Sequence, residues 1–425
     1  MFKAYQEYKS SDLIWTSSLP KFWEEKRIST FFIYKEDNIG NKWKTTQLLS
    51  LTKNGVIKKD INSGKGKSHS DYSTYQKIEK NDFIFCLFDI DETPRTVGLS
   101  SIEGMITSAY TAFIPQKNID NRFMYYLFEH IDDKKALKPF YSGMRKTIKS
   151  SDFLKLKVQF PPKQEQTQIA TFLDQETQKI AHLISKQEKL IELLEEQRKS
   201  ITSYAVTKGI NLNAEMKESG VEWLGEVPKD WNVTRFSSIF EENKRKNKGM
   251  IENNLLSLSY GRIIEKDINN AKGLVPENFD TYQIIYPNDI IFRFTDLQND
   301  KRSLRSAYST FKGIITSAYI SVSSQKEINI EFYHYLFRTY DLMKVFYSMG
   351  DGMRQSLKID ELNKMLILIP SIEEQNKIVE FINNENTKIN HLIQKQTTLI
   401  EKLKEYRASI ISHAVTGKID VRNLI

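Results

Sequence analysis

Cysteine and long apolar runs are scarce in this chain, and each scarcity excludes a class of protein. Cys86 is the only cysteine among 425 residues, so no internal disulfide can form and a reducing compartment is expected. No apolar run reaches the roughly 18 to 20 residues that a membrane span needs. No apolar segment follows Met1 as it would in a secretory signal. We therefore expect a cytoplasmic protein that does not enter a membrane.

The motifs that usually carry catalysis or nucleotide binding are also missing. The six histidines are scattered, without a second ligand at zinc spacing. The glycine- and lysine-rich run 63–68 lacks the first glycine of a phosphate loop, because Ile61 stands at that position. Asp82 and Asp289 precede β-like runs but have no nuclease-like Glu-x-Lys partner, and the Asn/Asp-Pro-Pro-Tyr/Phe motif of adenine methyltransferases is absent. We expect no catalytic residue and no metal on this chain.

The charge balance favours a polyanionic partner. Lys and Arg outnumber Asp and Glu by 62 to 54, which gives a formal net charge of +8. Such a surplus is typical of proteins that bind nucleic acid, although a solvated basic surface has the same composition. With 40% hydrophobic residues, the chain can also bury real cores, and its length predicts two or more domains.

The sequence is a tandem duplication with a half-length near 209 residues. Ile106-Thr107-Ser108-Ala109-Tyr110 recurs 209 positions later at 315–319, and Arg198 recurs in the same way as Arg407. So many ordered matches indicate an internal repeat. We divide the chain into a first domain, a central helix, a second domain and a C-terminal helix, at residues 1–160, 161–210, 211–369 and 370–425.

The segment that opens each half predicts an α+β domain. Short β-like runs at 82–88 and 289–294 are separated from others by Gly, Asn, Asp and Pro clusters. A helix-like aromatic patch at 123–128 recurs at 332–337. Each half therefore combines a small sheet with at least one helix.

A long helix with a coiled-coil seam follows each domain. Its apolar residues recur in steps of 3, 4 and 7, which is the a/d spacing of a coiled coil. The predicted seam residues are Ile169, Leu173, Ile180, Leu183, Leu190, Leu194 and Ile201 in the first helix, and Ile378, Ile382, Ile389, Leu392, Leu399, Leu403 and Ile410 in the second. A narrow apolar stripe needs a partner in water. We favour an internal antiparallel pair related by a pseudo-two-fold axis; the alternative is pairing with another chain.

Two motifs, each present once in each half, carry a resemblance to a known family. Residues 161–173 read Pro-Pro-Lys-Gln-Glu-Gln-Thr-Gln-Ile-Ala-Thr-Phe-Leu, and residues 369–378 give the second copy. The junction 220–231 reads Gly-Val-Glu-Trp-Leu-Gly-Glu-Val-Pro-Lys-Asp-Trp and has a degenerate counterpart at 14–23. With a variable domain before each helix, the chain resembles the specificity subunits of type I restriction–modification systems.

That resemblance implies a function and a set of partners. The two domains would be target recognition domains that each read one half of a split, asymmetric site on double-stranded DNA. The helices would fix the spacing and dock two modification subunits, which bind S-adenosylmethionine and methylate adenine. Restriction subunits that use ATP and Mg would translocate and cut the DNA. This chain would recognise the sequence without catalysing a reaction.

Candidate DNA-binding residues come from exposed basic segments. A glycine-containing loop occurs in both halves, so it favours phosphate contact over base reading, although its arginines could pair with internal carboxylates instead. Its candidates are Arg145, Lys146, Lys149, Arg354, Gln355 and Lys358. Base reading is expected from segments that differ between the halves, because arginine can grip guanine bidentately. These candidates are Lys65, Lys67, Arg95, Arg262, Arg293, Arg302 and Arg305.

Two other functions stay open at this point. A coiled-coil scaffold would organise proteins without reading DNA, and the divergent basic loops argue against it. A self-sufficient nuclease or methyltransferase would need a hidden catalytic site, and the missing motifs argue against that. Steep loss of DNA affinity with added salt distinguishes the first alternative, and activity of the isolated chain distinguishes the second.

Overall fold

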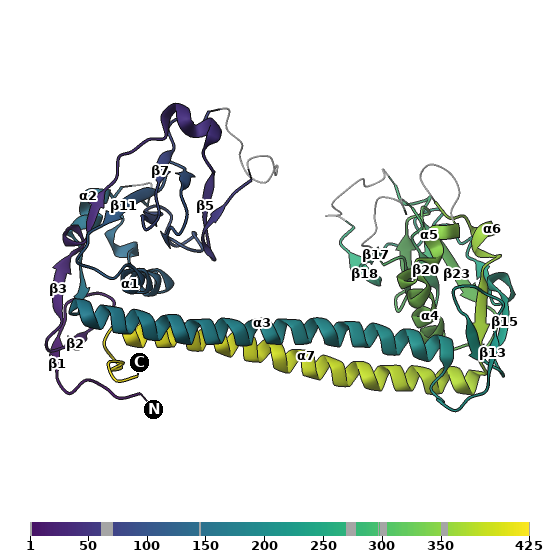
Figure 1. Cartoon of the computed structure of the whole chain (residues 1–425). Coiled ribbons are helices and arrows are strands. Elements are labelled where there is room, and N and C mark those ends of the chain that lie inside the picture. The colour runs from purple at the N-terminus through teal and green to yellow at the C-terminus, as the bar shows by residue number, and fades with distance from the viewer. Residues whose placement is uncertain are drawn as a thin grey trace. The chain divides into compact units, whose positions relative to one another are not determined.

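The chain forms two compact units that share two long helices. The computed structural model describes residues 2–60, 71–143, 146–268, 278–295, 297, 304–349 and 356–424. Unit 1 consists of Met1–Gln187 and Thr397–Ile425, and unit 2 of Glu188–Gln396. The helices α3 (Lys163–Lys208) and α7 (Ile372–Val415) each contribute one part to each unit (Figure 1).

Unit 1 is an α+β domain built around a four-stranded antiparallel sheet in the order β4-β11-β8-β9. Between β4 and β8 along the chain lie the hairpin β5–β6 and the strand β7, and β7 pairs with β10. Strand β3 pairs with β12, the strand that leads into α3. The elements are β1 (Tyr8–Ser10), β2 (Ser18–Pro20), β3 (Glu24–Arg27), β4 (Phe32–Tyr34), β5 (Leu49–Thr52), β6 (Gly55–Lys58), β7 (Gln76–Ile78), β8 (Phe83–Phe85), β9 (Val97–Leu99), β10 (Gly104–Ile106), β11 (Thr111–Pro115), α1 (Asn121–Asp133), α2 (Ser150–Lys155) and β12 (Lys157–Phe160).

The central strand β8 is apolar throughout because it is covered on both faces. Side chains alternate along a strand, so Phe83 and Phe85 pack into the core that contains α1, while Ile84 belongs to a second core under the β5–β6 hairpin. Helix α1 begins where the side chain of Asp120 accepts hydrogen bonds from the backbone N–H groups of Arg122 and Phe123.

Unit 2 repeats this architecture. Its sheets have the orders β16-β23-β20-β21 and β18-β17-β22-β19, and β15 pairs with β24 before α7 begins. Asn329 caps α4 as Asp120 caps α1. The elements are β13 (Met216–Glu218), β14 (Glu226–Pro228), β15 (Asn232–Arg235), β16 (Phe240–Glu242), β17 (Leu255–Ser259), β18 (Arg262–Lys266), β19 (Gln283–Ile285), β20 (Ile290–Phe292), β21 (Ser306–Tyr308), β22 (Gly313–Ile315), β23 (Ile320–Ser324), α4 (Ile330–Leu342), α5 (Val345–Met349), α6 (Ile359–Leu362) and β24 (Leu366–Ile369).

The two long helices pack against each other in opposite directions within each unit. In unit 1, Leu173 near the start of α3 shares a core with Ile410 near the end of α7. In unit 2, Val206 near the end of α3 shares a core with Ile378 and Ile382 near the start of α7. The predicted α+β class, with two similar domains and antiparallel long helices, is confirmed, and the helices are paired inside one chain.

The segments before β1 and after α7 also belong to unit 1 and contact each other. The backbone N–H of Asp420 donates to the carbonyl of Lys3 at 2.7 Å, and Tyr8 Oη donates to the carbonyl of Gly417 at 2.9 Å. Tyr5 Oη donates to Glu165 Oε1 at 2.5 Å in the first turn of α3. The residues that follow α7 therefore help to complete the N-terminal domain.

The buried seam of the helices differs from the predicted one at four positions. Four predicted seam leucines are 40–43% exposed, and their isoleucine neighbours lie closer to the seam. The exposed residues are Leu183, Leu190, Leu392 and Leu399, and the neighbours are Ile184, Ile191, Ile393 and Ile400. Three-residue and four-residue steps both return to nearly the same helix face, so a Leu-Ile pair satisfies either choice. The prediction was wrong at these four positions because the seam continues with a four-residue step, as from Ile180 to Ile184, and not with the three-residue step that we expected.

A pair of adjacent leucines tests this register. Leu194 is 8% exposed and Leu193 is 48% exposed on the same turn of α3. Leu194→Ala should lower the free energy of unfolding by about 2–3 kcal/mol, because it leaves a cavity in the seam. Leu193→Ala should change it by less than about 0.5 kcal/mol. Urea denaturation followed by circular dichroism measures both, and equal effects would contradict the assigned seam.

Candidate nucleic-acid interface

The repeated glycine-containing loop of unit 1 is folded back by hydrogen bonds on both sides. The N–H of Ser142 donates to the carbonyl of Thr147 at 2.8 Å, and the N–H of Ile148 donates to the carbonyl of Leu87 at 2.7 Å. Gly143 adopts a φ of +69°, which a residue with a side chain rarely does. Lys149 is exposed at the start of α2. Lys149 is therefore a surface cation that could contact a phosphate.

Lys146 lies on this loop and already has acidic neighbours. Its Nζ is 3.3 Å from Asp91 Oδ2 and 3.4 Å from Glu92 Oε1, and its side chain is half exposed. These two carboxylates raise the pKa of Lys146, and Asp91 contributes more than Glu92. An exposed pair of this kind contributes little to stability, so Lys146 can exchange a carboxylate for a phosphate.

Several predicted contacts fall outside the described residues. These are Lys65, Lys67, Arg145, Arg302, Arg354 and Gln355. In the second copy of the loop, Lys358 is described: it is exposed at the start of α6 and its backbone N–H donates to Glu361 Oε2 at 2.7 Å. Lys358 and Lys149 thus occupy equivalent helix starts in the two units.

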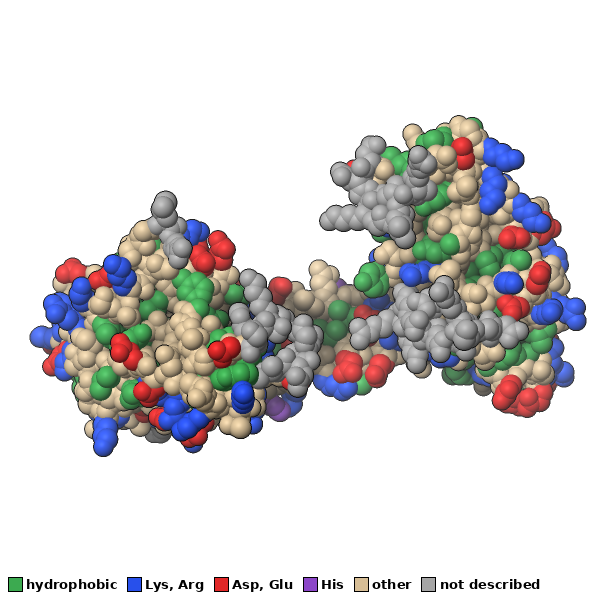
Figure 2. All heavy atoms as spheres, turned by 90° about the horizontal axis from the view of Figure 1, so that it is seen from above, with side chains coloured by type: hydrophobic (Ala, Val, Ile, Leu, Met, Phe, Trp, Pro, Cys, Tyr) green, Lys and Arg blue, Asp and Glu red, His purple; other side chains and the backbone are tan. Residues whose placement is uncertain are grey.

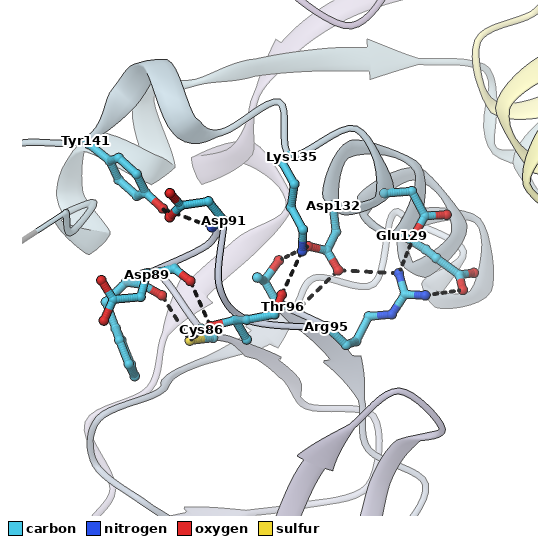
Figure 3. Close-up of polar contacts among 12 residues, drawn as sticks. Cys86, Asp89, Asp91, Arg95, Thr96, Glu129, Asp132, Lys135 and Tyr141 are labelled. Atoms are coloured by element: carbon cyan, nitrogen blue, oxygen red, sulfur yellow. Dashed lines mark hydrogen bonds and ion pairs between the residues drawn. The ribbon is translucent and has the colours of Figure 1, made fainter. Parts of the chain in front are cut away.

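Arg95 points into the domain. Its guanidinium lies 3.2 Å from Glu129 Oε1, 3.3 Å from Asp132 Oδ2 and 3.0 Å from Asp133 Oδ1, and its side chain is only 12% exposed. Figure 3 shows Arg95 directed at the carboxylates of α1, with Thr96 donating to Asp132 beside it. Three carboxylates thus pair with the Arg95 guanidinium inside the domain. The prediction that Arg95 reads bases was wrong, because its side chain belongs to an internal ion-pair network.

Arg305 is also an interior residue. Its side chain is fully buried, and Nη1 donates to the carbonyl of Thr295 at 3.0 Å. Its backbone N–H donates to Asp341 Oδ2 at 2.8 Å, as Thr96 does to Asp132 in unit 1. Burial raises the pKa of the Asp341 carboxyl. A buried arginine cannot reach a base edge, so the prediction for Arg305 was wrong.

Arg262 and Arg293 differ in exposure. Arg262 is exposed at the tip of the β17–β18 hairpin, next to Tyr260, which is 88% exposed. Arg293 is partly buried, and its backbone N–H donates to the carbonyl of Arg305 at 2.8 Å. Of the predicted base readers in the described ranges, Arg262 is therefore the one that is exposed to solvent.

A basic hollow in unit 1 was not predicted. Lys44, Lys58 and Lys59 line a surface depression of about 570 Å³ beside the end of β6, together with the backbone and side chains of 45–48 and Asp60. These lysines come from segments 14 residues apart, so no local motif marks them. Figure 2 shows that Lys and Arg side chains are otherwise interspersed with Asp and Glu on the visible face of each unit.

The acidic residues considered as catalytic candidates have structural partners. Lys35 Nζ lies 2.6 Å from Asp82 Oδ2 with both side chains buried, and Arg245 Nη2 lies 2.5 Å from Asp289 Oδ2. Among the described residues, no group of three or more His, Cys, Asp or Glu could hold a metal ion. Over the same ranges, the helices are too short or too polar to cross a membrane.

Comparisons with known proteins agree with the architecture. Residues 20–201 match the family described as type I restriction modification DNA specificity domain. A Methanocaldococcus jannaschii protein named as the MjaX specificity subunit of a type I restriction enzyme is 26% identical over 325 residues, covering 72% of this chain and 70% of that protein. The type I restriction enzyme MjaVIII specificity subunit of the same organism is 23% identical over 296 residues, covering 64% of each.

Two solved structures share the fold. The first comes from work on complex assembly and conformational transition of a type I R-M system; it is 14% identical, with a TM-score of 0.59 over 94% of this chain and 99% of that one. The second is the HsdS subunit from Thermoanaerobacter tengcongensis, which is 12% identical, with a TM-score of 0.52 over 94% and 98% of the two chains. At these identities the likeness concerns the fold alone.

The internal network around Arg95 can be tested through its central carboxylate. Glu129 is 3% exposed and contacts both Arg95 and Arg407. Glu129→Gln should lower the free energy of unfolding by about 3 kcal/mol, because it leaves two arginines without their shared anion. Glu92→Gln removes a 73% exposed carboxylate and should have almost no effect. Urea denaturation compares the variants, and a neutral Glu129→Gln would contradict the network.

Proposed function

We propose that this chain is a specificity subunit of a type I restriction–modification system and selects the DNA sequence on which such a complex acts, because residues 20–201 match the DNA specificity domain of these systems and two similar proteins are named as their specificity subunits. The observation that supports this most strongly is the duplicated domain. Units 1 and 2 repeat one fold, yet the residues on their equivalent surfaces differ. Two unlike readers in one chain suit a split, asymmetric site on double-stranded DNA.

Recognition on this chain needs no catalytic group of its own. Phosphate contacts from Lys149 and Lys358 would position the duplex without reading sequence. Exposed residues that differ between the units, such as Arg262, would supply base discrimination. Because its target is chromosomal and invading DNA, the proposed place of action is the cytoplasm.

Apolar side chains on the outside of the long helices support docking of partner subunits. In unit 2, Leu190, Leu193 and Leu392 are 40–48% exposed; in unit 1, Leu183 and Leu399 are 43% and 41% exposed. None of the five lies in the internal seam, and such patches commonly mark protein interfaces. These exposed leucines would dock two modification subunits, which would bring S-adenosylmethionine and methylate adenine. Restriction subunits using ATP and Mg would join through them.

Methylation mapping tests the recognition role directly. Deleting this chain from its host should abolish one split, asymmetric adenine-methylated motif, because the modification subunits would lose the subunit that recognises their target sequence. Restoring the chain should restore the same motif. If the methylated motifs of the genome are unchanged by the deletion, the chain does not direct methylation.

A charge on the exposed leucine patch tests partner docking. Leu193→Asp should prevent the modification subunits from co-purifying, because a carboxylate in an apolar interface costs several kcal/mol. The chain itself should stay folded, since Leu193 is 48% exposed. Leu212→Asp is the matched control, because Leu212 is 81% exposed outside both helices. Light scattering after size-exclusion chromatography gives the mass, and an intact complex with Leu193→Asp would contradict this docking surface.

A further inference from the structure

In unit 1, a buried ion pair joins the globular domain to helix α7. Arg407 of α7 donates to both carboxylate oxygens of Glu129 on α1, with Nη1 3.0 Å from Oε1 and Nη2 3.4 Å from Oε2. Arg95 approaches the same carboxylate at 3.2 Å. Glu129 thus lies buried between two arginines, one from the helix and one from the domain (Figure 3 shows Arg95 and Glu129).

The duplication places an arginine at the position of that carboxylate in unit 2. Residues 121–133 and 330–342 form equivalent helices 209 positions apart, so Arg338 stands where Glu129 stands. At the same offset, Arg198 of α3 corresponds to Arg407 of α7, and Leu304 corresponds to Arg95. The arginine on the long helix is kept, while the anion that would hold it is replaced by a second cation.

These side chains line a hollow of about 340 Å³ in unit 2. Arg198, Lys199, Arg262 and Arg338 contribute four cations, and Glu195 contributes a carboxylate. Arg198 Nη2 donates to Asn390 Oδ1 at 2.6 Å, and Arg198 Nε is 3.7 Å from Glu195 Oε2, so a neutral amide is the nearest partner of this guanidinium. Over the described ranges, no carboxylate lies within 4.0 Å of the other three cations.

Arg338 is held in place by neutral groups. Its Nη2 donates to the backbone carbonyls of Gly261 at 2.9 Å and Ser306 at 3.0 Å. Gly261 has no side chain to interfere, and a Cβ there would lie 2.2 Å from the guanidinium. Burial lowers the pKa of Arg338, the nearby charge of Asp341 opposes this shift, and the charge of Arg262 adds to it. The guanidinium is therefore held in place by backbone carbonyls and, within the described ranges, has no carboxylate in direct contact.

Buried nitrogen atoms that have no hydrogen-bond partner in the described part of the chain belong to side chains that line the same hollow. Arg198 Nε, Arg338 Nε and His334 Nδ1 are buried and have no hydrogen-bond partner among the described residues. All three side chains line the hollow. Buried polar atoms are normally satisfied, and an unpaired buried charge is costly. The cluster has the composition of a site whose anion is supplied from outside the chain.

We propose that this hollow in unit 2 binds a phosphate group, which there takes the place that the Glu129 carboxylate occupies in unit 1. A guanidinium fork matches phosphate oxygens bidentately, and a tetrahedral anion can accept from several cations at once. The phosphate comes either from the DNA backbone or from free inorganic phosphate, and the two sources share this chemistry.

The first arm of the test needs no DNA and is therefore independent of the proposed function. Thermal unfolding of the full chain is measured with inorganic phosphate and with chloride at equal ionic strength. Phosphate should raise the unfolding midpoint of the wild type, since a ligand that binds the folded state stabilises it. R198Q should weaken phosphate binding by about tenfold or more, because it removes one charge-assisted fork.

A second variant, R338E, replaces a cation of the hollow by a carboxylate. It places at position 338 the carboxylate that position 129 carries in unit 1, so the variant should lose its response to phosphate. R235E is the matched control, because Arg235 is an exposed arginine of the same unit outside the hollow. It should respond to phosphate as the wild type does.

The second arm identifies the source of the phosphate. If the DNA backbone supplies it, R198Q should lower the affinity for all duplexes by a similar factor and reduce the salt slope by about one. If free phosphate supplies it, R198Q should lose phosphate stabilisation while its DNA affinity is unchanged. The proposal is overturned if R198Q and R338E match the wild type in both the phosphate and the DNA measurements.

Discussion

The apolar seam between α3 and α7 is the contact on which the rest of the structure depends. Neither helix can bury its stripe alone, and a helix of 46 or 44 residues with an exposed seam would be unfavourable in water. Because the start of α3 packs against the end of α7 and the reverse, both apolar stripes are buried within one chain. It also brings a segment from each half of the sequence into each unit, so neither unit is a product of one half alone.

The fold was largely predictable because duplication makes the same pattern visible twice. The β-like runs, the aromatic patch that became α1 and α4, and the long helices all recur at a nearly constant offset. The seam register was not predictable, because Leu183-Ile184 and Leu190-Ile191 offer apolar residues at both candidate positions. Only the packed structure distinguishes them, with the isoleucine turned towards the seam.

The candidate site was predicted less well, and the reason is distance along the chain. Arg95 and Arg305 look like surface cations in the sequence. However, Arg95 pairs with carboxylates of α1 that lie 37 and 38 residues further along the chain, and the buried Arg305 guanidinium donates to the backbone carbonyl of Thr295. Lys44, Lys58 and Lys59 meet only because the β5–β6 hairpin returns to the preceding segment. Charge composition indicates how many cations a chain has; tertiary pairing decides which of them remain available to a ligand.

The shared helices also constrain the order in which the protein can be completed. Unit 1 contains the first globular domain, yet its core includes Ile410, Ala414 and Val421, and Arg407 pairs with its Glu129. More than 200 residues separate those positions from α1, and at roughly 5–20 residues per second their synthesis takes tens of seconds. The core of the N-terminal domain therefore stays incomplete until the residues of α7 have been synthesised.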